Sequence, residues 1–208
     1  MRKYIKSYAL IAAVAATATF TANANTTRNW IGGTGTADAP KNLWDYANWD
    51  GEGNFYDGNT VDCYLSVTDT TYLNSANGGN RFCCDLVPNA GDFVFTGPLK
   101  FYSFKPGRVA NSTVSIVKKS GDWTIQTYGM YIGNASGTTV KFVNESGNIT
   151  STANSYGVHI GYAGGATGIV ENISGDWTIA GSLTVSDASG GTGAFTIKGR
   201  QRFRRHRS

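Results

Sequence analysis

Apolar and polar residues alternate in short segments along the second half of the chain. Val114-Ser115-Ile116 and Val140-Lys141-Phe142 are two examples. A period of two places alternate side chains on opposite faces of a β-strand. Residues of the Gly, Ser and Asn types separate these segments and are typical of turns. The pattern predicts an all-β chain built from short strands.

A repeat runs through residues 111–199. The segment Ser120-Gly121-Asp122-Trp123-Thr124-Ile125 returns at 174–179, and a degenerate copy lies between them at 146–151. The interval is about 26 residues, within the range of about 20–50 residues that marks stacked supersecondary units. Two further markers keep the same phase, one beginning at Asn134 and one at Met130.

Aligning the copies sorts the apolar residues into four columns. These are Ile116, Phe142, Val170 and Phe195; Met130, Val158 and Leu183; Ile132, Ile160 and Val185; and Trp123, Ile149 and Trp177. Each copy therefore contains three short strands. Units of this kind stack into a parallel β-helix, or β-solenoid, with like residues about 4.8 Å apart in successive coils.

Residues 25–110 have a different composition. They contain 14 aromatic residues and all four prolines. Strands rich in aromatic residues are expected around Phe93–Phe95 and Leu99–Phe104, and no stretch shows helical periodicity. We predict an aromatic-rich β N-terminal or cap region at 25–110, followed by solenoid repeats at 111–199.

The first 24 residues have the pattern of a secretory signal peptide. Three basic residues precede an uncharged apolar run from Tyr8 to Phe20, and Ala22-Asn23-Ala24 provides small residues for cleavage after Ala24. A short membrane anchor is the alternative, but 13 residues cannot cross about 30 Å of hydrocarbon as a helix. We expect an exported protein, periplasmic, extracellular or on the outer surface, with no transmembrane helix in the mature chain.

The formal net charge of +4 belongs to the two ends of the chain. Residues 25–199 contain ten Lys and Arg against all 14 Asp and Glu, a net charge of −4. This balance argues against nucleic acid as a partner. Five arginines lie in residues 200–208, where we expect a disordered basic tail. Its origin is either an out-of-frame or truncated coding sequence, or a native segment that binds anionic lipid or polysaccharide.

The chain has three cysteines, and export makes a disulfide the expected state. Cys63 can pair with either Cys83 or Cys84, which leaves one thiol over. No C-x-x-C spacing or neighbouring His points to a metal site, and no cofactor is expected.

Several of these motifs resemble those of bacterial secreted proteins with autotransporter-associated β-strand repeats. The resemblance rests on the Trp-Gly opening at 30–35, Asn48-Trp49, the segment Phe93 to Leu99, the Ser-Gly-Asp-Trp-Thr-Ile repeats and Gly191 to Ile197. It covers nearly all of residues 29–199. The resemblance implies a right-handed parallel β-helix of the passenger type on the cell surface.

Aromatic side chains provide the candidate glycan-binding residues. The repeat places Tyr131 and His159 in one outward-facing column, and Tyr128 and Tyr156 in another. Such a column can stack on sugar rings, or it can simply form cross-strand pairs worth about 0.2–1 kcal/mol. Trp49, with Trp30 and Trp44, is a further candidate for a carbohydrate-binding module.

One acidic column is a weaker candidate. Asp122, Asn148 and Asp176 align in successive coils, so the two carboxylates are expected roughly 10 Å apart. Glycoside hydrolysis with inversion uses about 6.5–9.5 Å. The structural interpretation is that the Asn links the turns and keeps the like charges apart.

We therefore expect a structural or adhesive protein without catalytic activity, with polysaccharide or cell-surface components as partners. The alternative is a polysaccharide lyase or hydrolase on the same fold, with acids and a base such as Lys141 on one face. Residues 111–199 contain only nine charged side chains, scattered, which counts against it. An unpaired last edge also invites edge-to-edge self-association.

Overall fold

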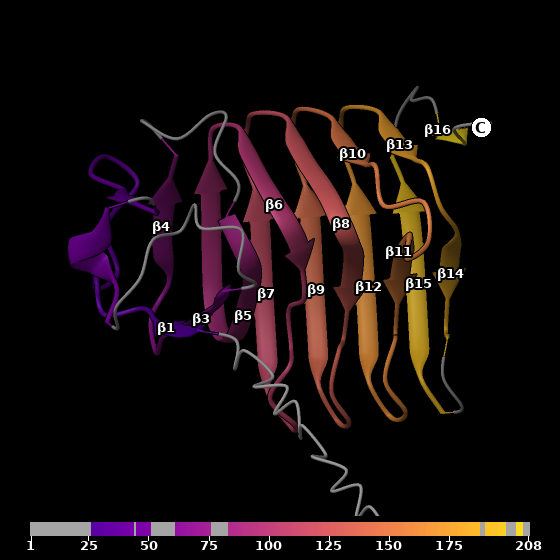
Figure 1. The fold of residues 1–208 in the computed structure, drawn as a ribbon, viewed down its shortest axis with the longest axis horizontal. Coiled ribbons are helices and arrows are strands. Elements are labelled where there is room, and N and C mark those ends of the chain that lie inside the picture. Colours follow the sequence, from indigo (N-terminus) through magenta and orange to yellow (C-terminus); the bar gives the residue numbers. More distant parts are fainter. Residues whose placement is uncertain are drawn as a thin grey trace, which may run out of the picture.

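The computed structural model describes residues 26–43, 45–50, 61–75, 83–187, 190–198 and 203–205. They form a parallel β-solenoid of about five turns with coils of about 26 residues, as predicted. In Figure 1 the coils lie side by side along the long axis of the molecule, from the indigo N-terminal part to the yellow C-terminal part. The one helix among the described residues is the 3-10 helix η1 (Tyr46–Asn48), and no described helix is long and apolar enough to cross a membrane.

The strands form three ladders, and every strand pair between them is parallel. The first ladder contains β2 (Lys41–Asn42), β4 (Thr71–Asn74), the end of β5 (Cys83–Thr96), β7 (Thr113–Lys118), β9 (Thr139–Asn144), β12 (Thr167–Asn172) and β15 (Thr192–Ile197). The second contains the start of β6 (Leu99–Phe104), the start of β8 (Trp123–Ile132), β10 (Ile149–Ser151), β13 (Trp177–Ile179) and β16 (Phe203–Arg205). The third contains β1 (Thr26–Asn29), β3 (Val61–Ser66), the start of β5, the ends of β6 and β8, β11 (Val158–Ile160) and β14 (Leu183–Val185).

The register between coils is the one that the sequence repeat predicts. In the first ladder Ile116 pairs with Phe142, which pairs with Val170, which pairs with Phe195. The columns that begin at Trp123, Met130 and Ile132 are also confirmed, residue by residue. All three ladders therefore keep like residues above one another through the repeat region.

The core is aromatic where the two compositional regions meet. Trp123 is fully buried, and its ring lies 5.2–5.7 Å from the rings of Phe95, Phe101, Phe104 and Phe142. Three of these phenylalanines come from the aromatic-rich region and one from the repeats. One continuous core therefore crosses residue 110.

The coils also begin earlier than the repeat in the sequence. β1 pairs with β3, and β3 pairs with the start of β5, all in parallel. β5 then pairs with both β4 and β7 in the first ladder. The change of composition at residues 110–111 is therefore not a break in the sheet, and the aromatic-rich region is itself built of coils.

Part of the basic tail is a strand. Phe203–Arg205 forms β16 and pairs in parallel with Trp177–Ile179 of β13. The prediction of disorder is therefore wrong for these three residues. The physical reason is that the backbone groups along the edge of β13 are otherwise unpaired, and a following segment of chain satisfies them whatever its side chains. Residues 1–25, 199–202 and 206–208 lie outside the described residues.

The Ser-Gly-Asp repeats form stacked turns. Gly121, Gly147 and Gly175 have φ values of +81°, +84° and +91°. A Cβ atom on Gly147 would lie 2.2 Å from the carbonyl oxygen of Gly121 in the preceding coil. Glycine is required here both by the backbone conformation and by the close approach of the next turn.

A ladder of buried polar side chains runs through the core beside these turns. Lys118, Asn144 and Asn172 occupy one column of the first ladder and are almost fully buried. Asn144 Nδ2 donates to Asn172 Oδ1 at 2.6 Å and to the carbonyl oxygens of Gly147 and Ser174. Lys118 Nζ donates to Asn144 Oδ1 at 2.9 Å and to the carbonyl oxygen of Ser146. We call these three residues the buried ladder; Lys118 is its first member.

Candidate functional site

The acidic column at the turns is structural. The backbone N–H of Asn148 donates to Asp122 Oδ1 at 2.7 Å, and the backbone N–H of Asp176 donates to Asn148 Oδ1 at 2.9 Å. Each side chain thus joins one turn to the next, and an amide separates the two carboxylates. The hydrogen bonds support the structural interpretation over an acid/base pair.

The predicted aromatic columns come together on the outer side of the third ladder. The rings of Tyr131 and His159 are stacked, with centroids 4.9 Å apart and an interplanar angle of 2°. Tyr128 and Tyr156 lie edge to face, with centroids 5.5 Å apart. Tyr162, which the sequence analysis missed, lies edge to face on Tyr131 at 4.7 Å. We call these five residues the tyrosine surface.

Hydrogen bonds fix the ring of His159. Its Nδ1 atom lies 2.6 Å from Asp187 Oδ2, and its Nε2 atom contacts the carbonyl oxygen of Tyr156. Burial, reinforced by the neighbouring Tyr162, raises the pKa of Tyr131 to about 12. The Tyr131 hydroxyl is therefore protonated at neutral pH and serves as a hydrogen-bond donor, not as a base.

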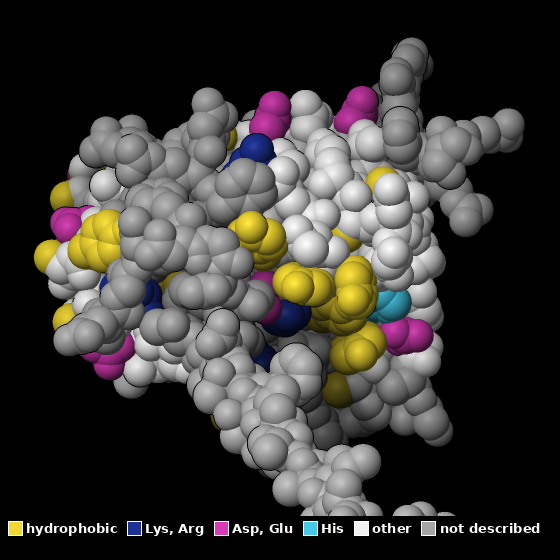
Figure 2. All heavy atoms as spheres, in the orientation of Figure 1, with side chains coloured by type: hydrophobic (Ala, Val, Ile, Leu, Met, Phe, Trp, Pro, Cys, Tyr) yellow, Lys and Arg dark blue, Asp and Glu magenta, His cyan; other side chains and the backbone are white. Residues whose placement is uncertain are grey.

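A groove of about 410 Å³ opens beside the tyrosine surface. Its lining is basic and aromatic: Lys105, Arg108, Tyr128, Tyr131, Asn134, Tyr156 and Tyr162. Figure 2 shows this face, where a yellow patch lies between dark blue basic side chains and the cyan histidine. The lining combines flat rings with two cations and contains no carboxylate.

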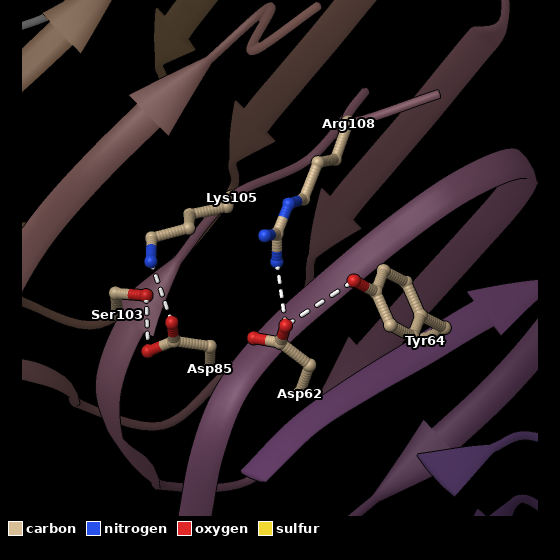
Figure 3. A network of polar contacts seen from close by, with 6 residues as sticks. All are labelled: Asp62, Tyr64, Asp85, Ser103, Lys105 and Arg108. Atoms are coloured by element: carbon tan, nitrogen blue, oxygen red, sulfur yellow. Dashed lines mark hydrogen bonds and ion pairs between the residues drawn. The ribbon is translucent and has the colours of Figure 1, made fainter. Parts of the chain in front are cut away.

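Two carboxylates lie behind the basic residues (Figure 3). Asp85, on β5, is 2% exposed and receives 2.5 Å hydrogen bonds from Lys105 Nζ and from the Ser103 hydroxyl. The ion pair of Lys105 and Asp85 joins two adjacent coils. Both oxygens of Asp85 are therefore occupied by groups of the protein.

Asp62 and Arg108 form the second ion pair. Arg108 donates to Asp62 Oδ2 at 2.8 Å, and the Tyr64 hydroxyl donates to the same oxygen at 3.2 Å. Burial alone would lower the pKa of Arg108, but the hydrogen bond and the charge of Asp62 outweigh it and raise this pKa. Arg108 is therefore firmly protonated and held beside the groove.

The sequence analysis missed this polar network, named here by its six residues in Figure 3. The count of scattered charges covered residues 111–199, whereas the network lies between residues 62 and 108. The one signal in the chain is the register: Asp62 pairs with Asp85, and Asp85 with Ser103. These coils are shorter than the later repeats, so no repeated motif marked the column.

Trp49 does not contribute to a surface site. Its side chain is 4% exposed, its Nε1 donates to the carbonyl oxygen of Leu43 at 2.9 Å, and its ring packs edge to face on Trp30 at 5.1 Å. Trp49 therefore belongs to the core at the N-terminal end of the solenoid, because its indole packs there and its polar atom finds a backbone partner inside. Trp44 lies outside the described residues.

Cys63 is disulfide-bonded and fully buried. The side chains of Cys83 and Cys84 lie outside the described residues, so both pairings remain open. In the part of the chain that the structure describes, no group of three or more His, Cys, Asp or Glu side chains could hold a metal ion.

Comparison with known proteins returned no match: no family model, curated protein or solved structure is similar to this chain.

Proposed function

We propose that this chain is an exported β-solenoid of the cell surface or extracellular space that binds polysaccharide without cleaving it. The observation that carries the proposal is the tyrosine surface beside the groove. The signal-peptide pattern at residues 1–24 and the resemblance to autotransporter-associated β-strand repeats support the location.

Tyrosine suits this role because its ring is flat and apolar while its hydroxyl forms hydrogen bonds. Tyr156 and Tyr162 are 44% and 37% exposed, which is high for side chains of this size. The neighbouring coils hold the rings in place, since Tyr131 packs on both His159 and Tyr162. A rigid, exposed aromatic surface loses little conformational entropy when a sugar ring stacks on it.

Immobilised polysaccharides provide the test. We expect the wild type to be retained and the Tyr156→Ala/Tyr162→Ala variant to bind about tenfold more weakly, because two stacking rings are lost. Tyr72→Ala is the matched control, since Tyr72 lies on β4 in the first ladder, away from the groove. Equal retention of all three proteins, or retention of none, would overturn the proposal.

The location has its own test. Secretion of the full chain followed by N-terminal sequencing should give a mature protein that begins at Asn25. A mature protein that still begins at Met1 would contradict cleavage after Ala24.

A polysaccharide lyase is the second candidate, and the polar network is the observation that favours it. Acids and bases on adjacent coils are what such an enzyme needs. Two features favour binding instead. The acids Asp62 and Asp85 are buried behind their cation partners, and Tyr131 is protonated at neutral pH. No described groove residue is thus an available base.

Incubation with soluble polyuronates distinguishes the two candidates. A lyase produces unsaturated ends that absorb ultraviolet light, and we expect no increase in absorbance. An increase that the Lys105→Gln variant abolishes would establish the enzyme and refute a purely binding role.

A further inference from the structure

The charges of the polar network are arranged so that the groove presents only its positive part. Asp62 and Asp85 are 4% and 2% exposed and do not line the groove. The side chains of Lys105 and Arg108 are 20% and 39% exposed and do line it. The network is neutral as a whole, but a ligand in the groove meets ammonium and guanidinium groups.

Arg108 has donors to spare. A guanidinium carries five N–H donors, and one hydrogen bond, from NH1 to Asp62, is formed among the described residues. The ion pair with Asp62 and the position of the guanidinium over the Tyr64 ring, 5.8 Å from its centroid, fix its orientation. A fixed guanidinium with open donors is suited to bind a carboxylate in a bidentate manner.

The cations and the rings follow one another along the solenoid axis. Lys105 and Arg108 come after β6, Tyr128 and Tyr131 belong to β8, and Tyr156 lies before β11, in the next coil. Coils are spaced by about 4.8 Å. A sugar chain parallel to the axis can therefore place one ring on the tyrosines while the adjacent residue reaches the cations.

We propose that the ligand of this groove is a uronate-containing polysaccharide, with a sugar carboxylate on Arg108 and Lys105 and a neighbouring ring on the tyrosine surface. This inference rests on the proposed function and names its ligand class. A carboxylated sugar carries one negative charge per ring. That charge suits two cations already balanced by Asp62 and Asp85 better than a dense polysulfate does.

The experiment measures the affinity of the full mature chain for three soluble glycans: polygalacturonate, the same polymer fully methyl-esterified, and dextran sulfate. We expect polygalacturonate to bind at least about tenfold more tightly than its ester, as a charge-assisted hydrogen bond predicts. Dextran sulfate should bind more weakly than polygalacturonate at physiological salt.

The key variant is Asp62→Asn/Arg108→Gln, which removes both charges of one ion pair and leaves no buried charge unpaired. It should lose the preference for the free carboxylate and keep the weaker binding of the ester. Lys119→Gln/Glu145→Gln is the matched control, since this ion pair is exposed and does not line the groove. The control should bind as the wild type does.

Each outcome is decisive. Equal binding of the ester and the free acid, lost in Tyr156→Ala/Tyr162→Ala, overturns the uronate inference but leaves glycan binding intact. Tighter binding of dextran sulfate, or an unchanged preference in Asp62→Asn/Arg108→Gln, overturns it as well, because binding then follows overall charge. Binding of none of these or any other glycan overturns the proposed function itself.

Discussion

Lys118 offers a direct test of the energetics of this core. Its ammonium group is fully buried at the start of the buried ladder, and burial lowers its pKa from 10.5 to about 8, although the nearby Asp122 opposes this. The perturbation is Lys118→Met, which keeps most of the side-chain length and removes the titrating group. Lys119→Met is the control, since Lys119 is half-exposed and paired with Glu145.

The sign of the pH dependence follows from the two states. Below pH 8 Lys118 is charged both folded and unfolded, and the folded protein is destabilised by burying that charge. Between pH 8 and 10.5 the folded protein releases the proton while the unfolded chain retains it, so stability rises with pH. The difference between 10.5 and about 8 corresponds to about 3 kcal/mol over the whole window.

The assay is urea unfolding of the wild type and both variants at intervals from pH 7 to 10.5, with the disulfide intact. The free energy of unfolding of the wild type minus that of Lys118→Met should rise by about 3 kcal/mol across this range. The same difference for Lys119→Met should stay flat. A flat profile for Lys118→Met would refute the reasoning. It would mean that the hydrogen bonds to Asn144 and Ser146 hold the proton against the desolvation.

Three further predictions concern stability and are read from urea or thermal unfolding. Asn144→Leu should cost about 3–5 kcal/mol, because it leaves the partners of four hydrogen bonds buried without them; a cost below about 1 kcal/mol would contradict the role of the buried ladder. Gly157→Ala should cost clearly more than Gly33→Ala: both have φ near +70°, but a Cβ on Gly157 meets the carbonyl oxygen of Ser182 at 2.1 Å, whereas one on Gly33 meets nothing within 4 Å. Equal costs would show that backbone strain alone matters. Reduction of the Cys63 disulfide should lower stability by about 3 kcal/mol, and a reduced protein as stable as the oxidised one would contradict this.

Much of the fold was predictable because a solenoid repeats its own environment. Phe142 and Val170 lie in equivalent positions of successive coils, so the same requirement for an inward apolar side chain recurs at a fixed interval. The stacking of Tyr131 on His159 follows from the same register. Where the interval is regular, a sequence alignment of the chain with itself is already a map of contacts.

The prediction fails where the interval changes or where the contact lies outside the repeat. The aromatic-rich region has shorter coils, so its strands were recognised but their parallel stacking was not. Trp49 has the composition of a binding residue, but its packing against Trp30 buries it. Phe203–Arg205 has the composition of a disordered tail, but it pairs with an edge strand.

The sequence by itself determined the strands, their register in the repeats and the two aromatic columns, because all of these follow from local periodicity. Only the tertiary structure decided the candidate site. The groove brings Asp62 and Arg108, 46 residues apart, into one ion pair and places them beside Tyr131. Residues so far apart meet because several coils of irregular length lie between them, and no local pattern encodes the sum of those lengths.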